Sequence, residues 1–329
     1  MARKNNAMSM TVHRVLVTGG AGFIGSHIVD KLVEEKYEVG ALDNLATGNI
    51  ANISAHVSAN RVKFHNCDIS DFEAVSKIVK DYDAVIHEAA LVSVTRSVED
   101  PLLTNRVNVD GTVNLLKASV DSGVKKFIFA SSSSVYGDME TLPKKETMIA
   151  SPISPYGISK LAAENYCRTF AKVYGLKTVC LRYFNVYGPR QKYGPYSGVI
   201  PIFIKKALNN EPPSINGDGE QTRDFTFIDD VVQANLLALK KDVATGTVYN
   251  AAAGGTISIN ELARHIIGMT GKKDLKPVHG PERSGDIRAS YSDISKISKE
   301  LGFKPQVGIE DGLRRVLEWF LAGNQSEWN

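Results

Sequence analysis

The stretch TGGAGFIGSH, residues 18–27, directly continues the apolar run HRVLVT (residues 13–18) and decides how the chain begins to fold. It places Gly19, Gly22 and Gly25 at intervals of three. Glycine permits a turn with positive φ, lets the backbone approach a pyrophosphate, and lets a helix pack closely on a sheet. The N–H groups at the start of the following helix are free to bind phosphate oxygens. The stretch therefore predicts a strand, a turn and a helix that bind a dinucleotide, rather than a merely structural turn.

The alternation of strand and helix continues along the first half of the chain. Short apolar runs predict strands at residues 13–18, 37–42, 62–66, 83–87, 125–130 and 177–184, and the stretches between them predict helices at residues 25–35, 72–80, 104–122 and 158–174. Strands and helices that alternate in this way form a doubly wound parallel sheet. We therefore expect an α/β fold of the Rossmann type, with ligands at the carboxyl ends of its strands.

The pattern changes after Asn185. Loops rich in glycine and proline, YGPRQKYGPYSG and NNEPPSINGDGEQ, separate shorter elements, with helices predicted at residues 229–240, 260–271 and 309–321. We expect a polar leader at residues 1–11, which lacks the apolar core of a signal peptide, and a dinucleotide-binding domain at residues 12–185. Residues 186–329 are expected to form a smaller mixed α/β domain that mainly holds the substrate.

The composition argues against several classes of protein. The chain has 329 residues, and 39 Lys and Arg against 36 Asp and Glu give a net charge of +3. The basic residues are scattered, which argues against a nucleic-acid partner or an anionic membrane surface. Cys67, Cys167 and Cys180 form no C-x-x-C pair, and His65 and His87 lack metal-ligand spacing. These features, without a run of about 18 apolar residues, favour a cytoplasmic protein with no metal.

Two aspartates follow the second and third predicted strands. Asp43 comes 18 residues after Gly25, where its carboxylate can hydrogen-bond the adenosine ribose and would repel a 2′-phosphate. This position favours NAD over NADP, although a turn at the start of DNLATG would also suit an aspartate. Asp68 can hold the adenine amino group or serve as a helix cap ahead of Asp71, and the sequence leaves both interpretations open.

The segment SPYGISK places Tyr156 and Lys160 four residues apart, on one face of a helix whose start is marked by Ser154 and Pro155. A tyrosine with a pKa of about 10 must lose roughly three units, or about 4 kcal/mol, to act as a base near neutral pH. A lysine charge about 5.5 Å away supplies roughly 3 kcal/mol at an effective dielectric constant of about 20. A cationic nicotinamide would supply the rest. The pair therefore predicts an acid–base centre, and an exposed helix pair is the plainer alternative.

Seven segments of the chain together resemble one enzyme family. They are TGGAGFIGSH, DNLATG, SSSSVYG, SPYGISK, LRYFNVYGP, NGDGEQTRDF and RSGDIRASYSD. In combination they resemble the extended short-chain dehydrogenase/reductase family, and most closely its UDP-hexose 4-epimerases, over residues 12–319. The resemblance implies NAD as the cofactor, a UDP-sugar as the substrate, and a homodimer built on the helices at residues 104–122 and 158–174.

The resemblance also assigns roles to single residues. Tyr156 is the base, Lys160 lowers the pKa of Tyr156 and holds the nicotinamide ribose, and Ser132 hydrogen-bonds the sugar 4-hydroxyl. The implied cofactor site is Gly19, Gly22, Phe23, Ile24, Gly25, Asp43, Asn44, Gly48, Asp68, Ile69, Ala89, Ala90, Asn108, Tyr156, Lys160 and Tyr183. The implied substrate site is Ser132, Ser133, Tyr156, Asn185, Val199, Ser214, Asn216, Arg223, Arg283, Asp286 and Ser290.

Four adjacent serines, Ser131 to Ser134, end a predicted strand in the segment FASSSSVYG. By the resemblance, Ser132 is catalytic and Ser133 flanks the sugar, while Ser131 and Ser134 satisfy backbone groups at the strand end. Relatives that eliminate water or carboxylate carry an acid just before VYG, and this chain has only serines there. The resemblance therefore implies oxidation at C4, rotation of the 4-keto sugar and hydride return to its opposite face, with NAD staying bound.

Three positions bear on the substrate and its pocket. Ser290 aligns with a tyrosine of members confined to UDP-glucose and UDP-galactose, so the smaller side chain implies room for an N-acetyl group. Val92 stands where the restricted members tend to carry lysine. We therefore expect UDP-GlcNAc and UDP-GalNAc as substrates, with the non-acetylated pair alongside them. Glu88 stands where the family often has an apolar residue, which leaves the detail of the nicotinamide pocket open.

Two other functions fit parts of the same sequence. A UDP-glucuronate 4-epimerase, or another nucleotide-sugar enzyme of this fold, would share these motifs, and no sequence feature excludes a C6 carboxylate. A non-catalytic NAD-sensing protein would be expected to lose one of Ser132, Tyr156 and Lys160, and all three are present.

Overall fold

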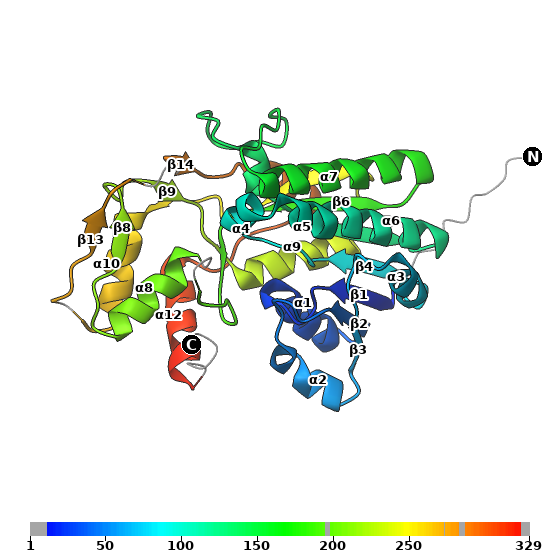
Figure 1. Cartoon of the computed structure of the whole chain (residues 1–329), viewed down its shortest axis with the longest axis horizontal. Helices are drawn as coiled ribbons and strands as arrows, with labels where there is room; N and C mark the ends of the chain where they lie inside the picture. Colours follow the sequence, from blue (N-terminus) through cyan, green and yellow to red (C-terminus); the bar gives the residue numbers. More distant parts are fainter. Residues whose placement is uncertain (1–11, 195–197, 273, 283–286, 324–329) are drawn as a thin grey trace, which may run out of the picture.

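A sheet of seven strands forms the centre of the molecule, of which the computed structural model describes residues 12–194, 198–272, 274–282 and 287–323 (Figure 1). The strands are β1 (Arg14–Thr18), β2 (Glu38–Asp43), β3 (Val62–Asn66), β4 (Ala84–His87), β5 (Lys126–Ser132), β6 (Thr178–Tyr183) and β11 (Thr247–Ala251). They lie in the order β11-β6-β5-β4-β1-β2-β3, and all neighbouring pairs are parallel. The predicted doubly wound sheet is therefore confirmed.

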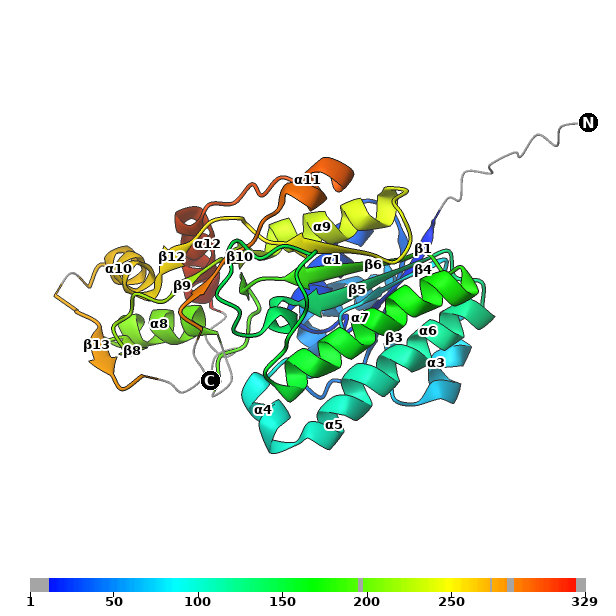
Figure 2. The same ribbon diagram turned by 90° about the horizontal axis from the view of Figure 1, so that it is seen from above.

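Both faces of the sheet are buried, because successive side chains of a strand point to opposite sides. In β1, Val15 and Val17 join the core beneath α1 (Phe23–Glu34) and α9 (Ile228–Lys240), whereas Leu16 joins the core on the other face. That second face is covered by α3 (Phe72–Val79), α6 (Gly111–Asp121) and α7 (Pro155–Tyr174). Figure 2 shows α3, α6 and α7 together along one side of the sheet and α9 on the other.

The helix predicted at residues 104–122 consists of three segments. It begins as α5 (Pro101–Asn105), passes through a π-helical turn, η2 (Arg106–Asp110), and continues as α6. Single π-helical turns inside α-helices occur often at functional sites. Here the turn carries Asn108, a predicted site residue. The short helix α4 (Val94–Glu99) precedes these segments.

A second region lies beside the carboxyl ends of the strands (Figure 1). It contains α8 (Val199–Leu208), α10 (Ile259–Met269), α12 (Ile309–Leu321), β8 (Ser214–Asn216), β9 (Thr222–Arg223), β12 (Ile257–Ser258), β13 (Val278–Gly280) and β14 (Ala289–Ser290). These strands form two small sheets, β13-β8 and β12-β9-β14. A domain division after residue 185 stays a proposal, and α9 and β11 are segments beyond that residue which pack on or join the central sheet.

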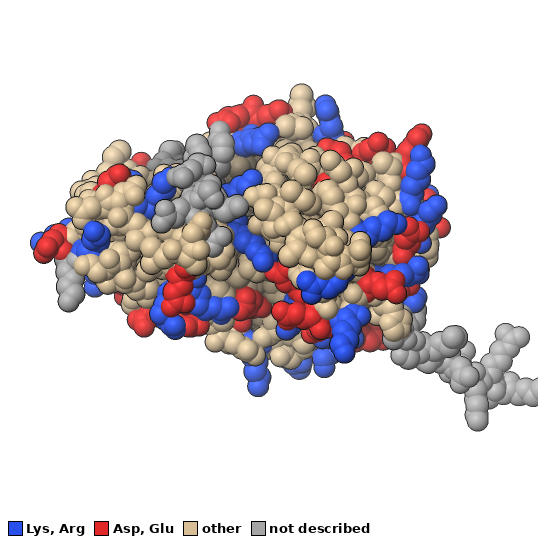
Figure 3. All heavy atoms as spheres, turned by 90° about the horizontal axis from the view of Figure 1, so that it is seen from below, with Lys and Arg blue, Asp and Glu red and all other residues tan. Residues whose placement is uncertain are grey.

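The remaining elements connect these two regions or cover their edges. They are η1 (Ile50–Asn52), α2 (Ser54–Ser58), η3 (Ser133–Tyr136), α11 (Ser295–Leu301), and the pair β7 (Val186–Tyr187) and β10 (Thr226–Phe227). On the face drawn in Figure 3, lysine and arginine side chains are interspersed with aspartate and glutamate. Within the described ranges, none of the helices is both long and apolar enough to cross a membrane.

Candidate active site

A cavity of about 600 Å³ lies at the carboxyl ends of the central strands, where the strand order reverses between β1 and β4. Most of the predicted cofactor residues line it: Gly19, Gly22, Phe23, Ile24, Gly25, Asp43, Asn44, Asp68, Ile69, Ala89, Ala90, Tyr156, Lys160 and Tyr183. Gly48 and Asn108 do not. The Asn108 side chain instead accepts from Leu91 N at 2.8 Å and donates to Leu91 O at 3.0 Å, so it positions a residue of the cavity wall from behind.

The glycine turn leaves no room for side chains at two of its three positions. Gly19 has a φ of +67°, and a Cβ there would lie 2.8 Å from Ala89 N. A Cβ on Gly25 would lie 2.1 Å from the carbonyl oxygen of Gly19. Gly22 caps α1 with no side-chain hydrogen bond to the first N–H groups of the helix. These donors can bind a pyrophosphate, so the turn fits the predicted dinucleotide.

Asp43 ends β2 with its carboxylate in the cavity wall. The two oxygens accept from Ala21 N at 3.1 Å and from Leu45 N at 2.8 Å. Burial raises the pKa of this carboxyl against those hydrogen bonds. Gly48 lies beneath it, since a Cβ on Gly48 would be 2.8 Å from both carboxylate oxygens. Asp43 therefore has the turn role. Each oxygen keeps a second lone pair, so the predicted bond to a ribose hydroxyl is compatible with it.

Asp68 is not the cap of α3. That helix is capped by Asp71, whose side chain accepts from Ala74 N at 3.0 Å. The Asp68 carboxylate instead accepts from Asn44 Nδ2 and from Ser70 N, both at 2.8 Å. It lies in the cavity wall near Asp43, as an adenine-binding role requires.

The proposed acid–base residues meet at the carboxyl end of β5. Ser154 caps α7 by accepting from Gly157 N at 3.1 Å, which brings Tyr156 and Lys160 to the cavity. Lys160 is 3% exposed, and its Nζ donates to Ala130 O at 2.8 Å. Burial lowers the pKa of Lys160 to about 8 and raises the pKa of Tyr156 to about 12, which a hydrogen bond with Ser132 opposes.

The serine tract divides into two groups. All four serines line the first cavity, with Ser132 the last residue of β5 and Ser133 the first of η3. Ser132 Oγ donates to Ser134 Oγ at 3.1 Å. Ser132 Oγ also accepts from Ser134 N, so the side chain that binds a backbone group at the strand end is that of Ser132, whereas the hydrogen bond given for the Ser134 hydroxyl is to a side chain. Ser131 donates to Glu164 Oε2 at 2.8 Å, and its partner is therefore a buried side chain instead of the backbone.

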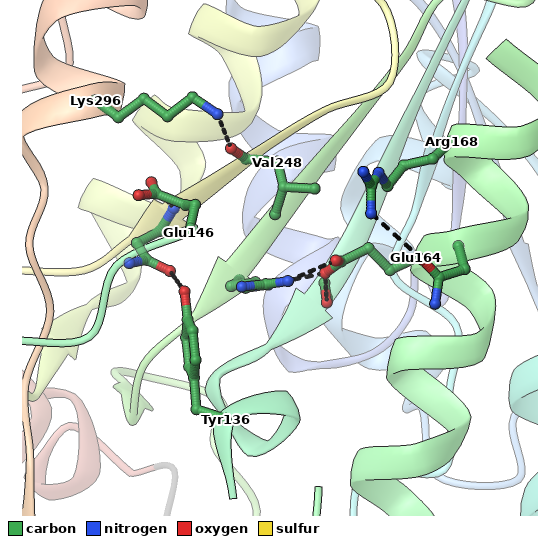
Figure 4. Close-up of polar contacts among 10 residues, drawn as sticks. Tyr136, Glu146, Glu164, Arg168, Val248 and Lys296 are labelled. Atoms are coloured by element: carbon green, nitrogen blue, oxygen red, sulfur yellow. Dashed lines mark hydrogen bonds and ion pairs between the residues drawn. The ribbon is translucent and has the colours of Figure 1, made fainter. Parts of the chain in front are cut away.

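A buried ion pair lies behind these residues. Glu164 and Arg182 are joined by two hydrogen bonds, Nε to Oε2 at 2.9 Å and Nη2 to Oε1 at 2.7 Å. The guanidinium also lies 4.7 Å from the centre of the Tyr136 ring, and the Tyr136 hydroxyl donates to Asn250 at 2.6 Å. Figure 4 shows Glu164 and Tyr136 projecting from different elements. The pair thus ties β5, β6 and α7 together beneath the cavity.

His87, one of the two histidines without metal-ligand spacing, is buried and has both ring nitrogens bonded. His87 Nδ1 lies 2.7 Å from Thr18 Oγ1, and Nε2 lies 2.9 Å from Thr112 Oγ1. Burial lowers the pKa of His87 to about 3, so the ring is neutral. Through these two bonds the side chain joins the ends of β1 and β4 to α6.

A second cavity, of about 310 Å³, continues from the first into the smaller region. The two share Asn185, Val186 and Gln191 in their walls. Five predicted substrate residues line the second cavity: Asn185, Val199, Ser214, Asn216 and Arg223. Asn185 has a φ of +29° and donates from Nδ2 to Asp224 O at 3.0 Å, which holds it at the junction.

Ser132, Ser133 and Tyr156, which are also predicted to bind the substrate, line the first cavity, and Ser290 is in the wall of neither. Ser290 lies in β14, paired in register with Arg223 of β9, and its carbonyl oxygen accepts from Asp224 N at 3.0 Å. It therefore stands next to a wall residue. Arg283 and Asp286 lie outside the described residues.

Several wall residues were missed from the sequence. Arg96, Leu103, Val107 and Gln191 line the first cavity. Arg96 and Leu103 come from α4 and α5, short helices with no clear apolar period, and Gln191 from a loop. The sequence around these residues does not mark them as pocket residues, because only the tertiary fold brings them to the cavity.

These features define a class: an α/β enzyme that holds a dinucleotide beside a tyrosine–lysine pair and opens into a second ligand cavity. Residues 15–252 match the NAD dependent epimerase/dehydratase family, and the chain belongs to this family. The predictions of family and NAD are thereby confirmed. The glycine turn, Asp43, Asp68 and the tyrosine–lysine pair are the residues that would hold the cofactor.

Known proteins similar to this chain support the same assignment. A putative UDP-glucose 4-epimerase of Methanocaldococcus jannaschii is 43% identical over 317 residues, covering 95% of this chain and 100% of the relative. A Thermotoga maritima UDP-glucose 4-epimerase solved with UDP-glucose has a TM-score of 0.89 and 42% identity, covering 94% of this chain and 99% of that one. A Methanobrevibacter ruminantium UDP-N-acetylglucosamine 4-epimerase, in complex with UDP-N-acetylmuramic acid, has a TM-score of 0.90 and 41% identity, covering 94% and 98%.

Proposed function

We propose that this protein reversibly inverts C4 of a UDP-hexose, with UDP-GlcNAc and UDP-GalNAc as its principal pair. The observation that carries the proposal is the position of Ser132, Tyr156 and Lys160. They stand in the wall of the cofactor cavity, which passes into a second cavity at Asn185. A sugar that reaches Tyr156 from the second cavity would present its carbinol to the cofactor. The epimerase names of the relatives agree with this reaction.

Each residue has a separate task in the reaction. When bound, NAD supplies a hydride acceptor and a cationic ring beside Tyr156. Tyr156 takes the proton of the sugar 4-hydroxyl and later returns it, and Ser132 orients that hydroxyl by a hydrogen bond. Lys160 holds its charge against the Ala130 carbonyl and is poised to bind a ribose hydroxyl. The 4-keto sugar must turn over in the second cavity before it is reduced on the opposite face.

The protonation state of Tyr156 sets the main energetic requirement. Burial raises the pKa of Tyr156 to about 12, so ionisation near neutral pH costs roughly 7 kcal/mol at about 1.4 kcal/mol per unit. This is more than an exposed tyrosine would need. A cation close to the phenol is therefore required, and proton transfer is expected only in the cofactor-loaded enzyme.

The position of the acids disfavours elimination. None of the four serines at the end of β5 is replaced by a carboxylic acid. The charge of Glu88 acts on Tyr156 and Lys160, but its carboxylate accepts from Tyr183 and lines the cofactor cavity rather than the second one. A dehydratase needs an acid that faces the sugar's leaving group.

The proposal is tested by incubating the purified protein, without added NAD, with UDP-GlcNAc, UDP-glucose and UDP-glucuronate in separate reactions. Chromatography then resolves each substrate from its C4 epimer. Formation of UDP-GalNAc supports the proposal. Turnover of UDP-glucose alone overturns the preference for acetamido sugars, and turnover of UDP-glucuronate alone makes the protein a uronate epimerase. Failure on all three, even with NAD supplied, overturns 4-epimerase activity.

Ser290 provides a variant for the substrate range. Ser290→Tyr introduces an aromatic ring beside Arg223, and it should lower turnover of UDP-GlcNAc by roughly a hundredfold relative to UDP-glucose, because a pocket rejects extra volume at about this level. Ser292→Thr, a small change two residues along the chain, serves as the control. Equal losses on both sugars in Ser290→Tyr would contradict the gatekeeper role.

We also propose that the protein acts as a homodimer. Apolar side chains are strongly exposed on neighbouring helices: Val98 on α4 at 64%, Leu102 on α5 at 78%, and Ile158 and Val173 on α7 at 56% and 63%. A second copy would cover them. Light scattering should give a dimer for the protein and a monomer for Leu102→Asp, with Ile149→Asp, at an exposed position before α7, as the control. A monomeric unaltered protein would refute the dimer.

A further inference from the structure

Glu88 lies immediately after β4 and has no role in the proton transfers described above. Its carboxylate lines the cofactor cavity and accepts a 2.6 Å hydrogen bond from the Tyr183 hydroxyl. That hydroxyl in turn accepts from Asn235 Nδ2 of α9 at 2.7 Å. These two hydrogen bonds fix the Glu88 carboxylate at the end of the sheet. Both donors, Tyr183 and Asn235, are uncharged side chains.

The polar side chains around Glu88 come from three elements. Lys160 and Tyr156 come from α7 and Tyr183 comes from β6, while α9 contributes the uncharged Asn235. Burial raises the pKa of Glu88 to about 7, and both the Tyr183 hydrogen bond and the Lys160 charge oppose that rise. Glu88 in return raises the pKa values of Tyr156 and Lys160. Its charge is therefore felt by both acid–base residues.

We propose that the Glu88 carboxylate sets the electrostatics of the nicotinamide pocket, where it favours the oxidised, cationic cofactor over the reduced, neutral one. The inference rests on the proposed function for the location of the ring. A hydride acceptor has to lie within reach of the carbon whose hydroxyl is bound by Tyr156. Glu88, Tyr156 and Lys160 line the same cavity, so the Glu88 carboxylate would also act on a nicotinamide ring bound in it.

The charge balance of the reaction gives the direction of the effect. Oxidation of the carbinol breaks its C–H and O–H bonds, sending a hydride to the ring and a proton to Tyr156. The ring loses its positive charge, so a fixed carboxylate nearby loses a favourable interaction. Glu88 thus opposes accumulation of reduced cofactor, which would leave the enzyme unable to oxidise its next substrate if the keto sugar escaped.

The test compares the redox equilibrium of bound cofactor in three forms of the holoenzyme. The unaltered protein, Glu88→Gln and Glu88→Asp are equilibrated with a fixed ratio of oxidised and reduced viologen dye. Near-ultraviolet absorption then gives the ratio of reduced to oxidised bound cofactor. Glutamine keeps an acceptor for Tyr183 but removes the charge, and aspartate keeps the charge on a shorter side chain.

We expect Glu88→Gln to raise the ratio of reduced to oxidised cofactor by roughly tenfold to a hundredfold, since a charge interaction worth one pKa unit changes an equilibrium tenfold. Glu88→Asp should remain closer to the unaltered protein. An unchanged ratio in Glu88→Gln would overturn the proposal, because a merely structural residue would alter stability or binding without shifting this equilibrium.

A second measurement needs no variant. As the ring is reduced, Glu88 loses its cationic neighbour and gains affinity for a proton, so reduction should take up extra protons around pH 7. The reduced fraction in the unaltered protein should therefore depend more steeply on pH than that of free cofactor. A slope equal to that of free cofactor would contradict the proposal. Since neither measurement requires epimerisation, loss of the proposed function and loss of this inference are told apart.

Discussion

Two glutamates near the proposed catalytic residues differ sharply in their surroundings. Glu164 lies one turn beyond Lys160 on α7 and is 0% exposed, with Arg182 and Ser131 donating three hydrogen bonds to its carboxylate. Glu88 has Tyr183 as its hydrogen-bonded partner and otherwise faces the cofactor cavity. Arg182 and Tyr183 are consecutive residues of β6, so one strand serves both acids from opposite sides. The Glu164–Arg182 ion pair, called the closed pair below, stabilises the fold. Glu88, called the open acid, faces the cavity and can act on a bound cofactor.

The largest effect is expected from a substitution in the proposed acid–base centre at the cofactor cavity. Tyr156→Phe removes the group that accepts and returns the proton, and kcat should fall by about 10²–10⁴-fold, because that is what a general acid–base group contributes. The fold and the bound NAD should be retained. Tyr166→Phe, an exposed position on the same helix, is the control. Rates are read by chromatography of the epimers, and a loss below tenfold would contradict the role of Tyr156.

Removing one partner of the Glu164–Arg182 ion pair should destabilise the fold instead. Arg182→Met leaves the Glu164 carboxylate buried without its partner, which costs about 3–5 kcal/mol of unfolding free energy. Arg168→Met, on the exposed face of α7, is the matched control and should change stability by less than about 0.5 kcal/mol. Chemical denaturation measures both variants. Equal midpoints would mean that the buried pair does not support the scaffold.

The pH dependence of stability should separate the two acids further. Burial raises the pKa of Glu88 to about 7, so in the cofactor-free protein the folded state binds its proton more tightly than the unfolded state. The corresponding stability is fully present below the ordinary glutamate pKa and is lost as pH rises through about 7, by roughly 2 kcal/mol after allowing for contact with solvent. Denaturant titrations from acid to neutral pH should show this loss in the unaltered protein. The loss should be smaller in Glu88→Gln, where the part due to Asp224 remains because burial raises the pKa of Asp224 to about 7 as well. An unchanged loss in Glu88→Gln would assign all of it to groups other than Glu88.

The smallest effect is expected when both partners of the closed pair are replaced together. Replacing Arg182 by Met and Glu164 by Leu removes the unpaired charge, and the double variant should regain a stability within about 1 kcal/mol of the original protein. The measurement is again chemical denaturation, alongside Arg182→Met. If the double variant stayed as unstable as the single one, the loss would arise from the Tyr136 and Ser131 contacts rather than from charge.

The sequence predicted those parts of the fold that have a local cause. The strands β1 to β6 are short apolar runs, the glycine turn has a fixed spacing, and α7 begins at a cap of Ser154 and Pro155. The strand β11 (TVYNA) was not predicted, since its five residues follow a loop and become part of the sheet only by pairing with β6. The π-helical turn at Asn108 was also missed. The Asn108 side chain bonds Leu91 and Ser159, which are distant in sequence and could not be paired with it from the sequence.

The same distinction applies to the site. Gly19, Asp43, Tyr156 and Lys160 stand in motifs that carry their own chemical reason, and all four line the cavity. The Tyr183 bond to Glu88 joins residues 95 positions apart, and no pattern in the sequence relates them. The burial of Tyr156 was also not predicted from the sequence. Helical spacing alone suggested that Lys160 lowers the pKa of Tyr156, whereas burial in the cofactor-free site raises that pKa to about 12.

The central claim is transient oxidation at C4 inside one active site, and an isotope tests it directly. A UDP-hexose with deuterium at C4 is converted to its epimer in ordinary water, and mass spectrometry with NMR locates the label in the product. Since the hydride leaves and returns without meeting solvent, we expect the product to retain deuterium at C4. Loss of the label to water would mean that C4 is inverted through an exchangeable proton, and the assigned roles of NAD and Tyr156 would then be wrong.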